Sequence, residues 1–164
     1  MSRARLNGLE IDYEVSGSGP PVLLGHGYSA TRRMWDGQHR ALDDYRIISW
    51  SMRGHGHTES PGDPSKYSAD LTVADMQALL RHLAVERAVI GGLSLGGYVS
   101  LAFYLAHPEM VRALVICDSG PGYRNDEARA PSPSRDSFAG EHRRFAVTWD
   151  GGVPPREPAG VGAP

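Results

Sequence analysis

Cysteine is nearly absent from this sequence, because Cys117 is the single one among 164 residues. It cannot form an internal disulfide, and no neighbouring cysteines and histidines have the spacing of a zinc site. The sequence also lacks an apolar stretch of about 7–15 residues after Met1 and any run of about 18 apolar residues. We therefore expect a protein of a reducing, cytoplasmic compartment that is neither secreted nor partnered with a membrane.

An excess of positive charge is also missing. Lysine and arginine number 17 against 19 aspartate and glutamate residues, which gives a net charge of −2. No basic run or stripe offers a surface for phosphates, and nucleic acid is therefore not an expected partner. A chain of this length is long enough to bury one core and too short for two ordinary domains.

Leucine and isoleucine are absent from residues 130–164, although this stretch contains 6 of the 12 prolines and 5 of the 20 glycines. Its proline and glycine content predicts a disordered C-terminal tail. Residues 1–129 differ, because short β-rich apolar runs alternate there with segments of helical periodicity. This alternation predicts an α/β domain with a mostly parallel sheet.

Six strands are expected in this domain. Asn7-Gly8 lies between two short apolar runs, and since both residues tolerate positive φ the segment 3–15 is predicted to form an antiparallel hairpin. Four further strands, expected to be parallel, are predicted over residues 21–24, 46–50, 88–90 and 113–117. The spacing of apolar residues predicts helices over residues 34–42, 70–83 and 98–106.

The clearest chemical signal is Gly92-x-Ser94-x-Gly96, which lies between a predicted strand and a predicted helix. Small residues on both sides allow a tight turn that holds the serine hydroxyl clear of the backbone, and amides at the helix start favour developing negative charge. This context predicts that Ser94 is a nucleophile. The alternative is a glycine-rich turn with an ordinary N-capping serine.

Phosphate-binding loops are a weaker interpretation of the same segment. A P-loop needs Gly-Lys-Ser/Thr, but Gly96, Gly97 and Tyr98 stand there instead. The dinucleotide fingerprint needs a glycine at the position of Ser94. Neither nucleotide motif therefore fits, and no cofactor is expected.

Three ordered motifs carry a family resemblance: residues 24–28 (LGHGY), 52–56 (MRGHG) and 92–97 (GLSLGG). Together they resemble the α/β-hydrolase superfamily over residues 3–129, and most of all its small bacterial esterases, enol-lactonases and non-metal haloperoxidases. The resemblance implies a truncated α/β-hydrolase fold in residues 1–129. It also implies hydrolysis of a small ester or lactone through an acyl-serine intermediate, without a metal or an organic cofactor.

By this resemblance, the backbone amides of Tyr28 and Leu95 form the oxyanion hole. Two N–H donors directed at a developing oxyanion contribute several kcal/mol to the transition state, roughly 3–4 for one donor. Ser51 stands where relatives commonly carry an aspartate before Met-Arg-Gly-His-Gly, which predicts a less firmly held loop at that point.

Three histidines, at positions 26, 55 and 57, invite a metal site as an alternative. No carboxylate or cysteine accompanies them at ligand spacing. The resemblance instead implies that His26 and His55 brace backbone turns. A metal is therefore not expected.

A serine nucleophile needs a histidine base and usually a carboxylate to orient it, and in this superfamily both follow the serine in the chain. Asp118 follows the last predicted strand and is a candidate acid. His142 is the only histidine after Asp118, and no predicted strand leads directly into it. Neither is a convincing triad member. The enzyme is therefore expected to be incomplete as it stands.

Two further expectations follow from the break in the resemblance near residue 130. The tail resembles the product of a truncated, frameshifted or recombined reading frame. The alternative to a hydrolase is a non-catalytic remnant, or a protein-binding module of the same fold that self-associates through an exposed sheet edge.

Overall fold

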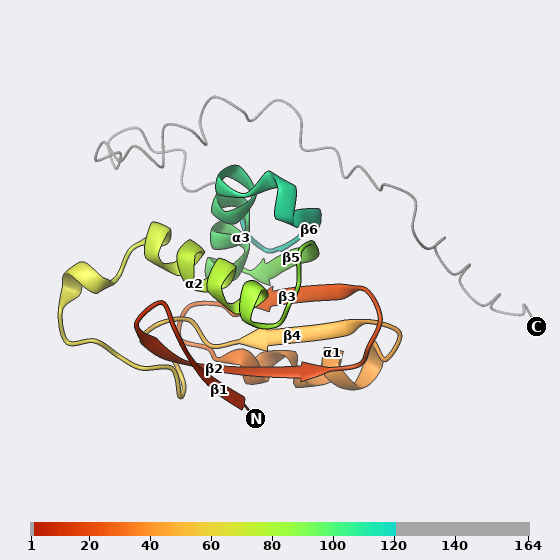
Figure 1. The fold of residues 1–164 in the computed structure, drawn as a ribbon, viewed down its shortest axis with the longest axis horizontal. Coiled ribbons are helices and arrows are strands. Elements are labelled where there is room, and N and C mark those ends of the chain that lie inside the picture. The colour runs from red at the N-terminus through yellow and green to blue at the C-terminus, as the bar shows by residue number, and fades with distance from the viewer. Residues whose placement is uncertain (1, 121–164) are drawn as a thin grey trace, which may run out of the picture.

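The computed structural model describes residues 2–120 of the chain, and the predicted tail at 130–164 lies outside them. These residues form one six-stranded sheet with helices on both faces (Figure 1). The strands are β1 (Ser2–Leu6), β2 (Leu9–Ser16), β3 (Pro21–Gly25), β4 (Arg46–Trp50), β5 (Ala88–Leu93) and β6 (Val111–Cys117). Their order across the sheet is β1-β2-β4-β3-β5-β6. The expected six-stranded α/β architecture is confirmed.

The N-terminal hairpin forms as its turn residues predict. Asn7 and Gly8 adopt φ values of 48° and 79°, and Leu6 pairs with Leu9 across the turn. β2 is antiparallel to β4 as well as to β1, whereas β4, β3, β5 and β6 run parallel to one another. The parallel strands therefore end at the same edge of the sheet, where the glycine-rich loops gather.

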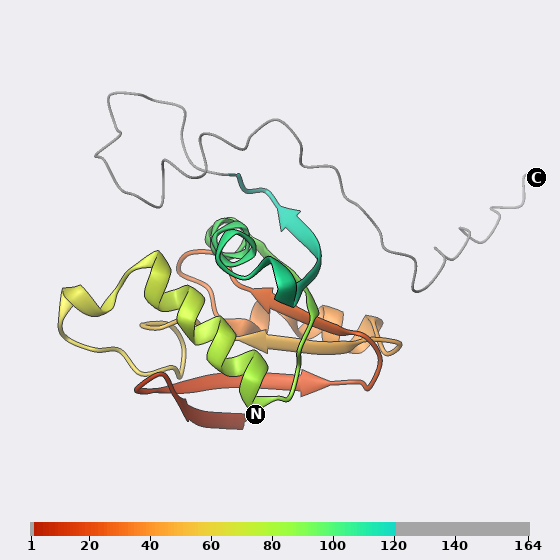
Figure 2. The ribbon, with the colours of Figure 1, turned by 45° about the horizontal axis from the view of Figure 1, so that its top comes forward.

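The helices cover the two faces of the sheet unequally. α2 (Ala69–His82) and α3 (Leu95–Ala106) lie on one face, and a 3-10 turn, η1 (Arg32–Trp35), continues into α1 (Asp36–Ala41) on the other (Figures 1 and 2). Successive residues of a strand point to opposite faces. Accordingly Ile48 belongs to the large core under α2 and α3, and Ile47 to the small core with Trp35.

A capping residue sets where α2 begins. Ser68 accepts a hydrogen bond from the Leu71 amide at 3.1 Å and caps this helix. The predicted helix over residues 34–42 is divided, because its first turn is the 3-10 turn η1. α3 begins at Leu95, three residues earlier than its apolar spacing predicted.

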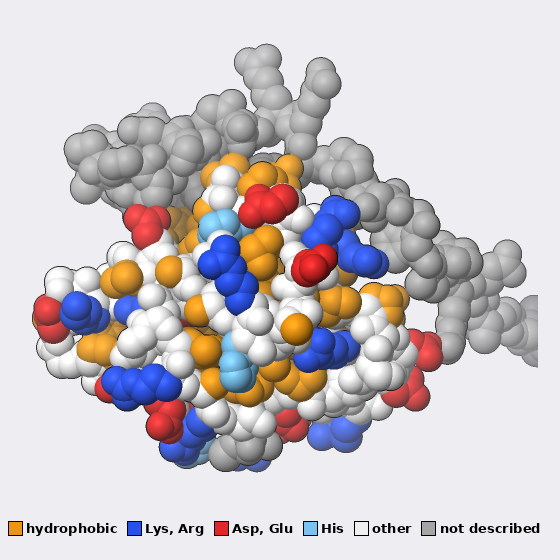
Figure 3. Space-filling view, in the orientation of Figure 1, with side chains coloured by type: hydrophobic (Ala, Val, Ile, Leu, Met, Phe, Trp, Pro, Cys, Tyr) orange, Lys and Arg blue, Asp and Glu red, His pale blue; other side chains and the backbone are white. Residues whose placement is uncertain are grey.

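Surface charge on the described part of the chain is mixed. On the face seen in Figure 3, basic and acidic side chains are interspersed among hydrophobic ones. No helix within residues 2–120 has the length and apolar character needed to cross a bilayer.

Candidate active site

Ser94 lies in the sharp turn between β5 and α3, with its side chain exposed. Its backbone adopts φ 49° and ψ −110°. A positive φ at a residue with a Cβ is strained by about 1–3 kcal/mol and persists only where the surroundings impose it. The predicted strand-turn-helix context of this serine is therefore present.

Two glycines make this turn sterically feasible. A Cβ placed on Gly92 would come within 2.6 Å of the carbonyl oxygen of Gly25, and one placed on Gly96 would collide with the same oxygen. These contacts involve backbone atoms, which cannot rotate away as a flexible side chain does. The structure thus confirms that positions 92 and 96 need glycine.

The loop after β3 passes beside Ser94. A Cβ placed on Gly27 would lie 3.9 Å from the Ser94 Cβ. Tyr28 follows in this loop with its side chain 76% exposed. Leu95 is the first residue of α3, so its N–H is among the amides that have no partner inside the helix. The loop and the helix start that carry the two predicted oxyanion donors therefore both border Ser94.

His26 is buried and joins two loops of this edge. Its Nε2 accepts a hydrogen bond from the Met52 amide at 2.9 Å, and therefore Nδ1 carries the proton and donates to the Gly27 carbonyl at 2.7 Å. Burial disfavours the imidazolium and lowers the pKa of His26, although the bond to Gly27 acts in the opposite direction. The neutral ring thus fixes the loop after β3 to the loop after β4.

The loop after β4 is held by residues distant in sequence. The Ser51 hydroxyl accepts from the Arg32 amide at 3.3 Å and donates to Asp12 Oδ2 at 3.4 Å. Asp12 also receives the Arg32 guanidinium at 3.0 Å, and both side chains are buried. Thr58 donates to the Ser51 carbonyl at 2.7 Å. Asp12, Arg32 and Thr58 thus all contact Ser51, and a loop weaker than one with aspartate at this position stays a prediction.

A second buried ion pair joins the same loop to α2. Arg53 Nε and Nη2 each donate to a carboxylate oxygen of Asp75 at 2.9 Å, and the remaining Arg53 donors reach the carbonyls of Lys66 and Leu71. Arg53 is thus occupied within the protein and is not free to bind an anionic substrate. Asp75 stands on the apolar face of α2, which was the only sequence signal for this pair.

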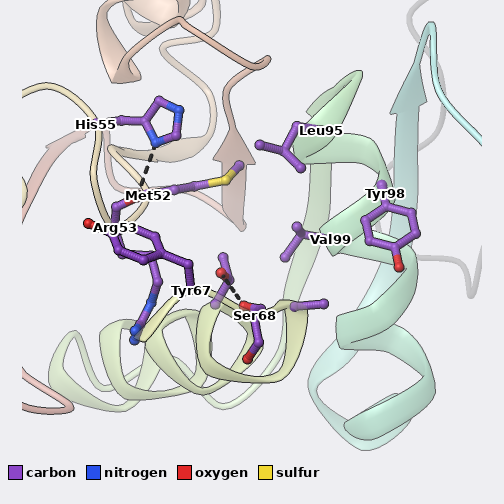
Figure 4. Close-up of a pocket in the computed structure, with 10 residues that line it drawn as sticks. Met52, Arg53, His55, Tyr67, Ser68, Leu95, Tyr98 and Val99 are labelled. Carbon is purple, nitrogen blue, oxygen red and sulfur yellow. Dashed lines mark hydrogen bonds between the residues drawn. The ribbon is translucent and has the colours of Figure 1, made fainter. Parts of the chain in front are cut away.

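A cavity of about 250 Å³ opens between this loop, the start of α2 and α3. Met52, Leu95 and Val99 project into it (Figure 4), and His55 lies at its rim with Nδ1 3.1 Å from the Arg53 carbonyl. The ring of His55 also lies 6.2 Å from that of Tyr28. The cavity therefore adjoins the loop after β3 and offers mainly apolar walls.

No general base reaches Ser94 from the part of the chain that the structure describes. Both nitrogens of His26 have backbone partners. Asp118 follows β6 with φ 44° and an exposed side chain, and His142 lies outside residues 2–120. Within those residues no group of three or more histidine, cysteine or carboxylate side chains is arranged to hold a metal ion.

Sequence reasoning missed Ser119, which contacts the turn that carries Ser94 directly. Its hydroxyl donates to the Ser94 carbonyl at 2.6 Å. A serine two residues beyond a strand carries no recognisable motif, and only the pairing of β5 with β6 brings the two serines together.

A family model for the alpha/beta hydrolase fold matches residues 20–151. This chain belongs to the α/β-hydrolase family. It is similar to epoxide hydrolase 1 of Siraitia grosvenorii, with 36% identity over 111 residues that cover 66% of this chain and 35% of that protein.

Solved structures show the same relationship. A thermophilic esterase from Thermogutta terrifontis aligns with a TM-score of 0.72 and 31% identity over 77% of this chain and 49% of its own. The enol-lactonase of Burkholderia xenovorans aligns with a TM-score of 0.69 and 29% identity over 73% of this chain and 47% of its own. The chain thus spans less than half the length of each of these three relatives.

Proposed function

We propose that this chain carries the nucleophile of a serine hydrolase that acts on a small ester or lactone. The observation that supports this most is the exposed Ser94 at φ 49° in a turn that only glycines at 92 and 96 permit. Strain of this kind is concentrated at functional sites. Hydrolase activity of the relatives points the same way, since two of them are an esterase and an enol-lactonase.

In the proposed reaction, the Ser94 oxygen forms a bond to the substrate carbonyl carbon. The bond from that carbon to the alcohol oxygen breaks, and the serine proton passes through a base to the departing alcohol. Water then attacks the acyl-serine, releases the acid and returns the proton to Ser94. The amides of Tyr28 and Leu95 stabilise the oxyanion in both steps.

Ester or lactone substrates fit a serine nucleophile better than epoxides do. A serine oxygen that opened an epoxide would leave an ether, which water does not cleave under mild conditions. Attack on a carbonyl instead leaves an ester that water can hydrolyse. We therefore propose a carbonyl substrate even though some relatives are epoxide hydrolases.

In this proposal the base belongs to a group beyond the described residues, and His142 and a complementing polypeptide are its two candidate sources. Asp118, which directly follows β6, is a candidate acid within the described residues. The cytoplasmic setting that the single cysteine suggested remains part of the proposal.

The test is turnover of p-nitrophenyl acetate by the purified full chain, with Ser94→Ala as the key variant and Ser60→Ala as the matched surface-serine control. Without a positioned base, we expect a rate only slightly above buffer, which the Ser94→Ala variant loses and the control keeps. A rate in Ser94→Ala equal to that of the parent would contradict the proposed nucleophile. A robust saturable rate that Ser94→Ala abolishes would show that the chain holds a base, either His142 or another group.

One observation favours a second candidate function, a non-catalytic protein-binding module. Within residues 2–120, β6 pairs only with β5, and Val115 on β6 is 43% exposed. An unpaired strand edge with apolar residues is a template for another strand. We expect oligomers by light scattering at micromolar concentration. A sharp monomer with cooperative unfolding would contradict this module.

A further inference from the structure

Both backbone groups of Ser94 are hydrogen-bonded to the end of β6 and the residues that directly follow it. Its N–H donates to the Cys117 carbonyl at 3.0 Å, and its carbonyl accepts from the Ser119 hydroxyl at 2.6 Å. Asp118, between them, has a φ of 44°. This kink brings the Ser119 side chain back to Ser94 while the Asp118 side chain remains exposed.

The carbonyl that Ser119 binds belongs to the same peptide unit as the Leu95 N–H. A peptide unit is planar, and in the trans form its C=O and N–H point in opposite directions. Fixing the direction of the Ser94 carbonyl therefore fixes the direction of the Leu95 N–H. The hydrogen bond also polarises the unit, which strengthens its N–H as a donor.

The first turn of α3 holds Ser119 in this position. A Cβ placed on Gly97 would come within 2.6 Å of the Ser119 Cβ, so the two residues are in close contact. The Tyr98 amide donates to the same Ser94 carbonyl at 3.0 Å, as expected within the helix. Ser119 thus supplies the second donor to this oxygen, and it approaches from outside the helix.

We propose that Ser119 is a positioning residue that orients and polarises the Leu95 amide as an oxyanion donor. The proposal rests on the proposed serine hydrolase function. Ser119 acts through the peptide between Ser94 and Leu95 and does not touch the substrate. Its loss should therefore slow acylation and leave substrate binding unchanged.

The kinetic test uses the full chain and p-nitrophenyl acetate as the acylating reagent. Peptide mass mapping measures how fast Ser94 is acylated. We expect Ser119→Ala to slow acylation about tenfold at an unchanged half-saturating concentration, less than the 10²–10³ lost with a complete oxyanion donor. Ser119→Thr and Ser119→Val form a matched pair of similar shape, of which only threonine keeps the hydroxyl. Threonine should restore acylation and valine should not. Equal rates in this pair would overturn the proposal.

A spectroscopic test separates this proposal from the proposed function. We expect the amide proton resonance of Leu95 to shift upfield in Ser119→Ala and Ser119→Val and to return in Ser119→Thr. If Ser94 of the parent protein is not acylated, the hydrolase proposal fails. The Leu95 resonance then decides the role of Ser119 by itself. A Leu95 resonance that is the same in the threonine and valine variants would overturn it.

Discussion

Two loops at the same edge of the sheet are held in place by different kinds of interaction. The loop after β4 depends on buried charge, since Arg32 pairs with Asp12 and Arg53 with Asp75. The turn after β5, which carries Ser94, has no such ion pair in the described part of the chain. It depends instead on backbone approach so close that only glycine fits.

The difference shows how the exposed Ser94 can lie beside a rigid support. In the proposed reaction an oxyanion develops on the substrate carbonyl oxygen next to Ser94; a nearby carboxylate would oppose that charge, whereas neutral amides stabilise it. Backbone collisions impose the strained φ of Ser94 without adding charge. The ion pairs lie in the neighbouring loop, where they fix its backbone.

Removing one partner of a buried pair should have the largest effect. We expect Asp75→Asn to lower the free energy of unfolding by about 3–5 kcal/mol, because it leaves the Arg53 guanidinium buried without its counter-charge. Urea denaturation of the full chain measures this change.

The control for this prediction is an exposed pair. Arg3 and Glu10 are 3.0 Å apart, with about half of each side chain exposed (45% and 47%). Glu10→Gln should cost less than about 1 kcal/mol. If Asp75→Asn cost no more than Glu10→Gln, the loop after β4 would not depend on buried charge.

An added methyl group tests the other loop. Gly96→Ala should lower the free energy of unfolding by about 1–3 kcal/mol, since the Cβ collides with the Gly25 carbonyl. Gly37→Ala is the matched control, because nothing lies within 4 Å of a Cβ at that position of α1. Alanine there should be neutral or stabilising by up to about 1 kcal/mol. Equal stability of the two variants would show that the turn is not held by close packing.

The sequence predicted the strands, turns and helices of this site well. It predicted poorly the side-chain contacts that hold the loops in place. The hairpin at Asn7-Gly8 and the strand-turn-helix around Ser94 follow from local rules of backbone conformation, and both are confirmed. The helix predicted over residues 34–42 is divided in the structure, because residues Arg32–Trp35 form the 3-10 turn η1 ahead of α1 (Asp36–Ala41). Local pattern could not indicate this, since Arg32 is fixed there by its contact with Asp12 on β2.

The supporting contacts depend on residues distant in sequence. Asp12 and Ser51 are brought together by the antiparallel pairing of β2 with β4. No periodicity or motif in the sequence predicts such a contact. The same holds for Ser119, which is 25 residues from Ser94 and reaches it only because β5 and β6 are neighbours.

The smallest predicted effect concerns His26, which links the loop after β3 to the loop after β4 through Gly27 and Met52. Burial lowers the pKa of His26 in the folded protein, so the unfolded chain takes up its proton first as the pH falls. Stability is therefore full above pH 6.5 and declines below it, by at most about 1.4 kcal/mol per pH unit for this histidine. The lowered pKa of His39, also caused mainly by burial, acts in the same direction.

Urea denaturation between pH 7.5 and 5.5 separates these contributions, with the pH range taken as roughly one unit either side of the histidine pKa. We expect His26→Gln to show a shallower decline than the parent, because glutamine does not titrate and its side-chain oxygen can still accept from the Met52 amide. His57→Gln, an exposed position, should leave the slope unchanged. If all three proteins shared one slope, a neutral His26 would not be what joins the loop after β3 to the loop after β4, and these two loops would support the Ser94 turn independently.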